Sequence, residues 1–508
     1  MMTGIIIGVL VGQNLFAKTY GGASEDYLNA FIKTPDGGYA AVGATNSYGI
    51  DSTDILVIKV SATGQLQWAK TIGGSRNEEG TGITRTTDGG YAITGYTSSY
   101  GAGICDIFIV KLDSLGIVQW TKTWGSSHPT QPDRGYSIIT TSEGYLIVGQ
   151  YLGQEGVFLW FDTLGNYIRH VAAPSNSAVA LYAVTQSSDG GYVATGYRYN
   201  GGNDLIILKS DASGHLVWCK AICDTFQGSG AEYGRSIVRT WDGGYAVAGY
   251  ANGWGAGNYN FIVIKTDGSG NIQWAKTLGG PLDDQAYSIC QTSDGGYAVA
   301  GWSYSFGAGS RDLLVARLSL PGDLIWARTF GAESYEGASG ITQLIDGSYT
   351  LAGLSQSFGA GGKDCLLIRL DSNGNYNGCV QDAAVTLGNI FPDTVYAPPY
   401  DDGASQPIGN MSVTALATSL TVMDACPTAV KETGTNPPGG IWTIGFSGGV
   451  IFWAEKETLL KIYASDGRLV LSQFIFKGKN WIGLEKGVYF WRAGPYKGKV
   501  AVLIEKGR

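Results

Sequence analysis

The sequence feature that most constrains this chain is a tetrapeptide, Asp-Gly-Gly-Tyr, that recurs at nearly constant spacing. The full copies are Asp36–Tyr39, Asp88–Tyr91, Asp189–Tyr192, Asp242–Tyr245 and Asp294–Tyr297, and degenerate copies lie at Ser142–Tyr145 and Asp346–Tyr349. The seven tyrosines are separated by 52, 54, 47, 53, 52 and 52 residues. Seven copies of a unit of about fifty residues are typical of a propeller or a solenoid.

Each unit divides into four short strands joined by tight turns. In the second unit we expect strands over residues 82–85, 91–96, 106–111 and 117–122. The first hairpin turn contains Asp88 and two glycines, which tolerate the positive φ of a two-residue turn. Four antiparallel strands make one blade, and no unit has the composition of a solenoid cap. The predicted fold class is therefore all-β, a seven-bladed β-propeller over residues 13–378.

The fourth strand of most units carries the pattern Gly-x-x-x-Trp-Ala/Thr-Lys, but the seventh unit stops after Gly374 without one. A segment in the same frame, Gly12 to Lys18, precedes the first unit. We expect residues 13–19 to supply the missing strand by pairing with residues 364–369, which removes two exposed sheet edges. The pattern's tryptophans are expected to pack between blades.

The longer loops provide two groups of candidate binding residues. A carboxylate precedes the first strand of six units, and the group is Asp26, Glu78, Asp133, Glu232, Asp284 and Glu336. If the first strand is innermost, these acids ring one mouth of the channel, either as a cation or polar-ligand site or as caps for backbone turns. The loops between the second and third strands carry the aromatic residues Tyr48, Tyr100, Trp254, Phe306 and Phe358. These rings either bind sugars or a protein partner or fold over their own blades.

The sequence gives little support for nucleic-acid binding, metal binding or catalysis. The net charge of −8 argues against a nucleic-acid partner, because binding to phosphates needs a basic surface. The three histidines do not belong to one motif, and no paired cysteine spacing predicts a zinc site. We therefore predict no metal, no cofactor and no catalytic residue. The apolar run at residues 5–12 is too short to span a bilayer and resembles the core of a signal peptide, so residues 1–12 are interpreted as its remnant.

The C-terminal part differs in charge from the rest of the chain. Residues 441–508 carry 11 Lys and Arg against 5 Asp and Glu, a net charge of +6. Within them, Leu459–Val470, Leu484–Phe490 and Lys499–Ile504 resemble the type A sorting domain of type IX secretion substrates. This resemblance implies a small β-sandwich domain, recognition by the secretion machinery, and a mature protein that is secreted or held on the outer cell surface.

Residues 379–440, rich in Pro, Gly, Thr and Asp, are predicted to be a linker. In an exported protein we expect Cys379 and Cys426 to form a disulfide, and the other five cysteines to be reduced and buried.

Three functions stay open at this point. The first is a non-catalytic, exported propeller that binds a glycan, protein or matrix component. The second is an enzyme with its site at the channel mouth, because the turn at residues 211–218 resembles those of quinoprotein propellers and, loosely, the sialidase Asp-box. The third is a structural subunit of an array. The sequence does not name a ligand.

Overall fold

The structure is a computed structural model that divides the chain into two compact units, Met1–Ala425 and Cys426–Arg508. It describes residues 15–376 apart from 50–51, 174–176 and 224–229. Beyond residue 379 it describes the strands β29–β41 with residues 383 and 385. The predicted signal-peptide remnant and both Cys379 and Cys426 lie outside the described residues. Of the other five cysteines, Cys105, Cys219 and Cys365 are buried, whereas Cys223 and Cys290 are partly exposed, so the prediction that all five are buried is wrong for these two.

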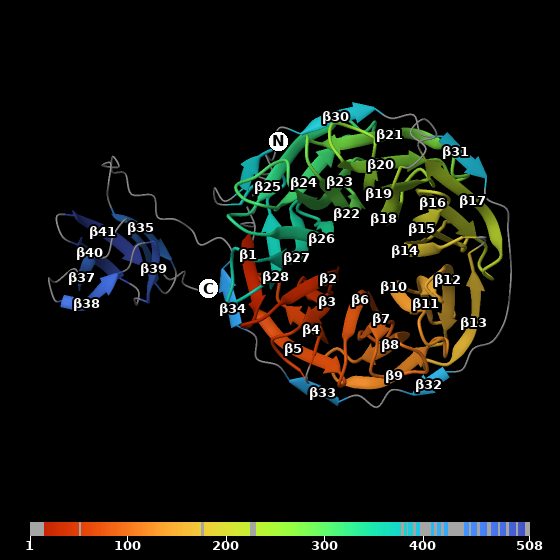
Figure 1. Cartoon of the computed structure of the whole chain (residues 1–508), viewed down its shortest axis with the longest axis horizontal. Helices are drawn as coiled ribbons and strands as arrows, with labels where there is room; N and C mark the ends of the chain where they lie inside the picture. The colour runs from red at the N-terminus through yellow and green to blue at the C-terminus, as the bar shows by residue number, and fades with distance from the viewer. Residues whose placement is uncertain are drawn as a thin grey trace, which may run out of the picture. The chain divides into compact units, whose positions relative to one another are not determined.

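The first unit is a ring of seven antiparallel sheets, which confirms the predicted seven-bladed β-propeller (Figure 1). In chain order the blades consist of β2 (Asp26–Lys33), β3 (Tyr39–Thr45), β4 (Asp54–Val60) and β5 (Leu66–Gly73); β6 (Glu78–Arg85), β7 (Tyr91–Thr97), β8 (Asp106–Leu112) and β9 (Val118–Trp124); β10 (Arg134–Thr140), β11 (Tyr145–Tyr151), β12 (Glu155–Phe161) and β13 (Tyr167–Ala172); β14 (Val179–Gln186), β15 (Tyr192–Tyr199), β16 (Asn203–Ser210) and β17 (Leu216–Cys223); β18 (Glu232–Arg239), β19 (Tyr245–Asn252), β20 (Tyr259–Thr266) and β21 (Ile272–Gly279); β22 (Asp284–Gln291), β23 (Tyr297–Ser303), β24 (Asp312–Leu318) and β25 (Leu324–Phe330); and β26 (Glu336–Gln343), β27 (Tyr349–Ser355) and β28 (Asp364–Leu370).

The seventh blade takes its fourth strand from the other end of the unit. Strand β1 (Phe16–Gly21) pairs antiparallel with β28, with Phe16 opposite Arg369 and Tyr20 opposite Cys365. The predicted ring closure is therefore confirmed. Because β28 and β1 would otherwise each expose a row of unpaired backbone groups, this pairing satisfies two strand edges at once.

One aromatic contact is repeated at every junction between blades. The tyrosine of the repeated tetrapeptide, or of its degenerate copies, lies 5.5–6.4 Å from an aromatic ring of the preceding blade, measured between ring centroids. The pairs are Phe16–Tyr39, Trp68–Tyr91, Trp120–Tyr145, Trp160–Tyr192, Trp218–Tyr245, Trp274–Tyr297 and Trp326–Tyr349. The pattern's tryptophans therefore lie between blades, as predicted, and Phe16 takes the equivalent position where the ring closes.

The aspartate of the repeated turn has a separate structural function. Asp88 accepts hydrogen bonds from Gly90 N and Thr86 Oγ1 within the hairpin, and its carboxylate lies 2.9 Å from the buried Lys111 Nζ. The hydrogen bond from Lys111 holds the pKa of Asp88 at about 2. The turn aspartate thus shapes the turn and neutralises a lysine that its own third strand buries.

Six of the seven sheets gain a fifth strand from the segment that the sequence predicts to be a linker. The strands of this outer belt are β29 (Val380–Asp382) on β25, β30 (Thr386–Asn389) on β21, β31 (Asp393–Tyr396) on β17, β32 (Ile408–Asn410) on β9, β33 (Thr414–Ala417) on β5 and β34 (Thr421–Asp424) on β1. They lie on the outside of the ring, shown in light blue in Figure 1. The chain therefore returns around the propeller, blade by blade, in the reverse order of the repeats.

The second unit consists of two further antiparallel sheets. One contains β35 (Ile441–Phe446), β36 (Gly449–Ala454) and β39 (Gly478–Gly483), and the other contains β37 (Thr458–Ala464), β38 (Leu469–Ile475), β40 (Gly487–Ala493) and β41 (Tyr496–Val502). In the larger sheet the order is β38-β37-β40-β41. This small unit is all-β, as the sequence predicts.

Removal of the belt is expected to expose the outer edge of six blades. In a chain that ends at residue 376, the amides of β5, β9, β17, β21 and β25 should exchange with solvent deuterium at least tenfold faster than in a chain that ends at residue 425. Strand β13 is an internal control, because no described residue pairs with its outer edge. Equal exchange of β5 and β17 in the two chains would contradict the belt.

Candidate ligand-binding site in the channel

The innermost strand of every blade contains a β-bulge at the same position. The ladder between the first and second strands shifts register across one residue in each of the seven sheets. These bulge residues are Asn29, Thr81, Tyr136, Tyr182, Arg235, Tyr287 and Ser339. A bulge leaves its extra residue outside the regular pairing and re-aims the side chain.

All seven bulge residues line one cavity of ≈ 460 Å³, here called the axial pocket. Its volume lies within the range of about 300–1,000 Å³ typical of small-molecule sites. Because each innermost strand contributes its bulge residue, the pocket lies where the seven blades converge. The residue at the bulge differs among the blades, since it is Asn, Thr, Tyr, Tyr, Arg, Tyr and Ser in chain order.

The axial pocket has two chemically different sides. Blades three to six contribute aromatic rings and a guanidinium group, from Tyr136, Tyr182, Arg235 and Tyr287. The remaining blades contribute the small polar bulge residues Asn29, Thr81 and Ser339. Serines that follow the bulge in blades three, five and six add further hydroxyl groups; these are Ser137, Ser236 and Ser288.

Arg235 lies at the centre of the aromatic side. Its guanidinium carbon is 4.1 Å from the centroid of the Tyr182 ring and 5.2 Å from that of Tyr287. Nη2 donates a hydrogen bond of 2.7 Å to Tyr250 Oη, whereas Nε is buried and has no hydrogen-bond partner among the described residues. Neighbouring tyrosines raise the pKa of Arg235, although burial opposes this, so the group stays charged.

A second arginine and one glutamate complete the charged groups that line the pocket. The guanidinium carbon of Arg134 is 5.0 Å from the centroid of the Tyr96 ring, and its Nε also lacks a partner among the described residues. Glu79 accepts hydrogen bonds from Tyr96 Oη and from Asn29 Nδ2, the latter at 2.8 Å. The lining therefore carries two positive charges and one negative charge.

The acids that the sequence places around the channel mouth are buried caps in the structure. Asp26, Glu78, Asp133, Glu232, Asp284 and Glu336 have exposed fractions of 0–1%. Glu78 is representative, because it accepts hydrogen bonds from Gly74 N at 2.6 Å, Ser99 N at 3.0 Å and Thr97 Oγ1 at 2.9 Å. Asp26, Asp133, Asp284 and Glu336 likewise accept hydrogen bonds from backbone N–H groups, so these acids have the backbone-capping arrangement that the sequence left open, and Glu232 is equally buried.

The aromatic residues of the outer loops pack within the ring, and most of them contact the preceding blade and not only their own. Tyr48 donates a hydrogen bond of 2.9 Å to Gly21 O, and Tyr100 donates one of 3.2 Å to Gly73 O. Phe358 packs against Phe330 with ring centroids 5.7 Å apart, Trp254 is buried in a core cluster, and the Phe306 ring lies close to Gly280. The two predicted groups therefore do not combine into one binding face.

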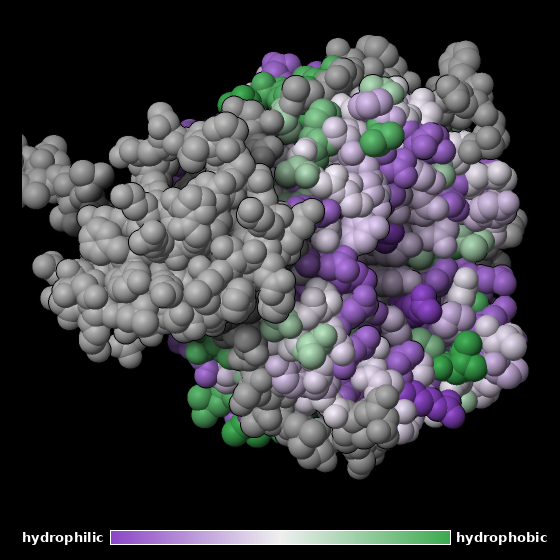
Figure 2. All heavy atoms as spheres, turned by 60° about the vertical axis from the view of Figure 1, so that its left-hand side comes forward, coloured by the Kyte–Doolittle hydropathy of each residue, from purple (hydrophilic) through white to green (hydrophobic). Residues whose placement is uncertain are grey.

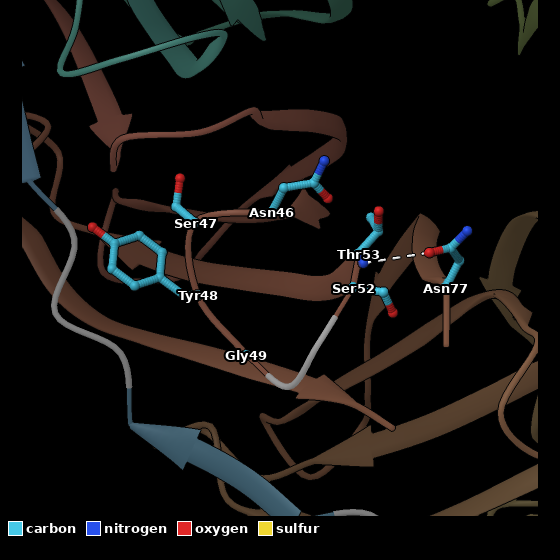
Figure 3. Close-up of a pocket in the computed structure, with 7 residues that line it drawn as sticks. All are labelled: Asn46, Ser47, Tyr48, Gly49, Ser52, Thr53 and Asn77. Carbon is cyan, nitrogen blue, oxygen red and sulfur yellow. Dashed lines mark hydrogen bonds between the residues drawn. The ribbon is translucent and has the colours of Figure 1, made fainter. Parts of the chain in front are cut away.

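A separate surface pocket lies next to one of these loops. Figure 3 shows Asn46, Ser47 and Tyr48 along one side, with Thr53 N and Asn77 Oδ1 joined by a hydrogen bond of 3.4 Å on the other. Tyr48 points away from these polar groups (Figure 3). Since the loop includes residues 50–51, which are not described, this pocket is not considered further.

On the face seen in Figure 2, the visible propeller surface has no large apolar patch. The visible part of this face is largely hydrophilic or neutral, with hydrophobic side chains in small, separate groups. The most exposed large hydrophobic residues stand at turn tips, such as Leu164 at 69% and Ile345 at 97%. Among the described residues, no group of three or more His, Cys, Asp or Glu is arranged to hold a metal ion.

Comparisons with known proteins do not assign a function. No family model matches the chain. The regulatory protein FlaEY of Caulobacter vibrioides is 25% identical over 220 residues, which is 38% of this chain and 22% of that protein, so the chain spans about a fifth of this relative's length. No helix of the described residues is long and apolar enough to cross a membrane.

The chain is also similar to two solved structures at low identity. The β-propeller domain of Cps50 (Swd1) from Myceliophteria thermophila has a TM-score of 0.42 and 9% identity, covering 68% of this chain and 97% of that one. A protein of unknown function from Dyadobacter fermentans has a TM-score of 0.40 and 11% identity, covering 70% and 98%. Neither likeness carries an inference about ligands.

A buried aspartate that precedes the capping acid of the next blade gives a pH-dependent prediction. Burial raises the pKa of Asp106 to about 6, the Gly103 N–H lowers it, and the Asp133 carboxylate adds to the rise. Because the folded pKa lies above the unfolded value of about 3.9, stability present below pH 4 is lost as the pH rises through 6. The fifth blade has Asn260, equally buried, at the matching position.

We therefore expect Asp106→Asn to stabilise the propeller at pH 8 by on the order of 1–2 kcal/mol and to have little effect near pH 4. The reverse change, Asn260→Asp, should destabilise the fold at pH 8. Urea unfolding at both pH values measures this. A stability change of Asp106→Asn that is the same at pH 4 and pH 8 would show that ionisation is not its cause.

Proposed function

We propose that this chain is a non-catalytic, exported binding propeller that holds a glycan in the axial pocket. The observation that carries this proposal is the contrast between repeated and variable positions. The repeated acids, tyrosines and tryptophans are structural, whereas the bulge position holds five residue types in seven blades, and all seven bulge residues line one cavity. A ring of differing polar and aromatic side chains around one cavity is suited to recognition.

The chemistry of the axial pocket supports a glycan more than an apolar ligand. The tyrosine rings of Tyr136, Tyr182 and Tyr287 supply faces on which a sugar ring can stack. Hydroxyl and amide groups from Thr81, Asn29 and the serines supply the donors and acceptors that sugar hydroxyls need. The loop aromatics, which the sequence suggested for this purpose, are already in contact with neighbouring blades.

An enzyme with its site at the channel mouth is the weaker candidate. The axial pocket contains one carboxylate, Glu79, among its described lining residues, and that group already accepts two hydrogen bonds. Glycoside hydrolysis most often uses a pair of carboxylates flanking the scissile bond. Binding without turnover therefore fits the lining best.

The proposal predicts that the axial pocket alone determines binding. On an array of neutral and acidic glycans, the full chain should bind a restricted set. Tyr182→Ala should weaken this binding by at least tenfold, because it removes one ring face of the pocket. Tyr48→Ala, a matched control on the outer loop, should leave binding unchanged. Loss of binding with Tyr48→Ala and not with Tyr182→Ala would place the ligand on the outer loops instead.

Export is proposed to depend on the second unit. This rests on the resemblance of residues 441–508 to type IX sorting domains and on the net charge of +6 of this segment. In a host that has this secretion system, the full chain should appear on the surface or in the medium. A chain that ends at residue 425, which keeps the whole propeller unit, should stay inside the cell. Equal surface labelling of the two chains would refute this role.

A further inference from the structure

We infer that the glycan bound in the axial pocket is acidic, and that Arg235 and Arg134 bind its carboxylate. This inference rests on the proposed function and names the ligand class of the same site. A uronic acid ring combines the three properties that the lining matches: a carboxylate, several hydroxyl groups and a sugar-ring face.

The first reason is that Arg235 has no counter-ion among the described residues. Its recorded partners are tyrosines, namely the hydrogen-bonded Tyr250 Oη and the rings of Tyr182, Tyr233, Tyr250 and Tyr287. A guanidinium group has five N–H donors in a planar fork, and that fork matches a carboxylate bidentately. The described residues pair none of its N–H groups with a carboxylate, so the charge is available to a ligand.

The second reason is that Arg134 repeats the arrangement two blades away. Its guanidinium carbon lies over the Tyr96 ring, and no described carboxylate forms an ion pair with it. Arg134 and Arg235 both line the cavity, and the Nε–H group of each is buried without a partner among the described residues, which is costly unless an acceptor is supplied. A bound carboxylate supplies the acceptors that the protein lacks.

The third reason concerns the charge that faces the two arginines. Glu79 is the one acidic side chain among the described residues that line the pocket, and it accepts hydrogen bonds from Asn29 and Tyr96. One carboxylate does not neutralise two guanidinium groups, so the empty lining has a net charge of +1. A ligand with one carboxylate brings the pocket to neutrality.

The rest of the lining selects a sugar over a simple anion. The rings of Tyr182 and Tyr287 lie next to Arg235, so a sugar whose carboxylate contacts Arg235 has an aromatic face within reach. Asn29, Thr81 and Ser339 line the opposite side and offer hydrogen bonds to ring hydroxyls. A pocket of ≈ 460 Å³ is much larger than a phosphate or an acetate ion requires.

Calorimetric titration of the full chain tests the inference with three matched probes: galacturonic acid, its methyl ester and neutral galactose. The acid should bind at least tenfold more tightly than the ester and the neutral sugar. Arg235→Gln should weaken binding of the acid by about tenfold to a hundredfold, because a charged hydrogen bond is lost. It should barely change binding of the ester. Arg235→Lys keeps the charge without the fork and should give an intermediate loss.

The control variant is Arg85→Gln, which changes an exposed arginine at the end of β6 and should leave binding unaltered. Thermal unfolding of each variant identifies any loss that is due to misfolding, and Arg134→Gln then provides an independent test. Equal affinity for the acid and the ester would overturn the inference, while the proposed function would stand if Tyr182→Ala still abolished binding. Binding of none of the three probes, together with no glycan bound on the array, would overturn both.

Discussion

The contact on which the propeller depends is the aromatic pair at each blade junction. A tyrosine from the repeated turn of one blade packs against a tryptophan of the preceding blade, and Phe16 replaces the tryptophan where β1 closes the ring. Aromatic pairs contribute about 0.5–1.5 kcal/mol beyond the area they bury. Seven of them therefore add an amount comparable with the net stability of a whole domain, about 5–15 kcal/mol. Because all seven junctions share the contact, the blades meet at similar angles around one axis.

That regular ring separates structural positions from recognition positions. The capping acids, such as Glu78, are fully buried and hold the loops that connect neighbouring blades. The bulges lie three residues further along the same strands and direct one variable side chain per blade into the axial pocket. Arg235 and Tyr182 thus occupy equivalent positions in neighbouring blades, and their 4.1 Å contact follows from the repeat itself.

The sequence predicts the blade count, the strand order and the closure by β1, because each depends on a repeated local pattern that pairing rules convert into a ring. It places the candidate site at acids that recur in six blades, and the structure shows these acids to be buried. The bulge residues carry only a weak signal, since position three after the acid differs among the blades, but so does position one. The bulge residue faces the channel because the strand pairing shifts register there. This shift becomes visible only in the paired strands and not in the sequence.

The outer belt was missed because its strands are three or four residues long and lie in a segment with the composition of a linker. Their starts are 6, 7, 15, 6 and 7 residues apart, which matches one strand per blade with one blade passed over. A weak signal exists, because Thr386, Thr414 and Thr421 recur and each lies opposite a glycine at the end of an outer strand. The belt strands do not alternate hydrophobic and polar residues, because each one only adds a short outermost strand to a blade.

The central claim is that ligand is bound by the bulge residues and not by the outer loops. Hydroxyl-radical footprinting of the full chain, with and without a saturating acidic oligosaccharide, measures this directly for each tyrosine. Our account predicts that the ligand protects Tyr136, Tyr182 and Tyr287, while Tyr48 and Tyr100 are oxidised at the same rate in both samples. Protection of Tyr48 and Tyr100, with unchanged oxidation of Tyr182, would contradict it.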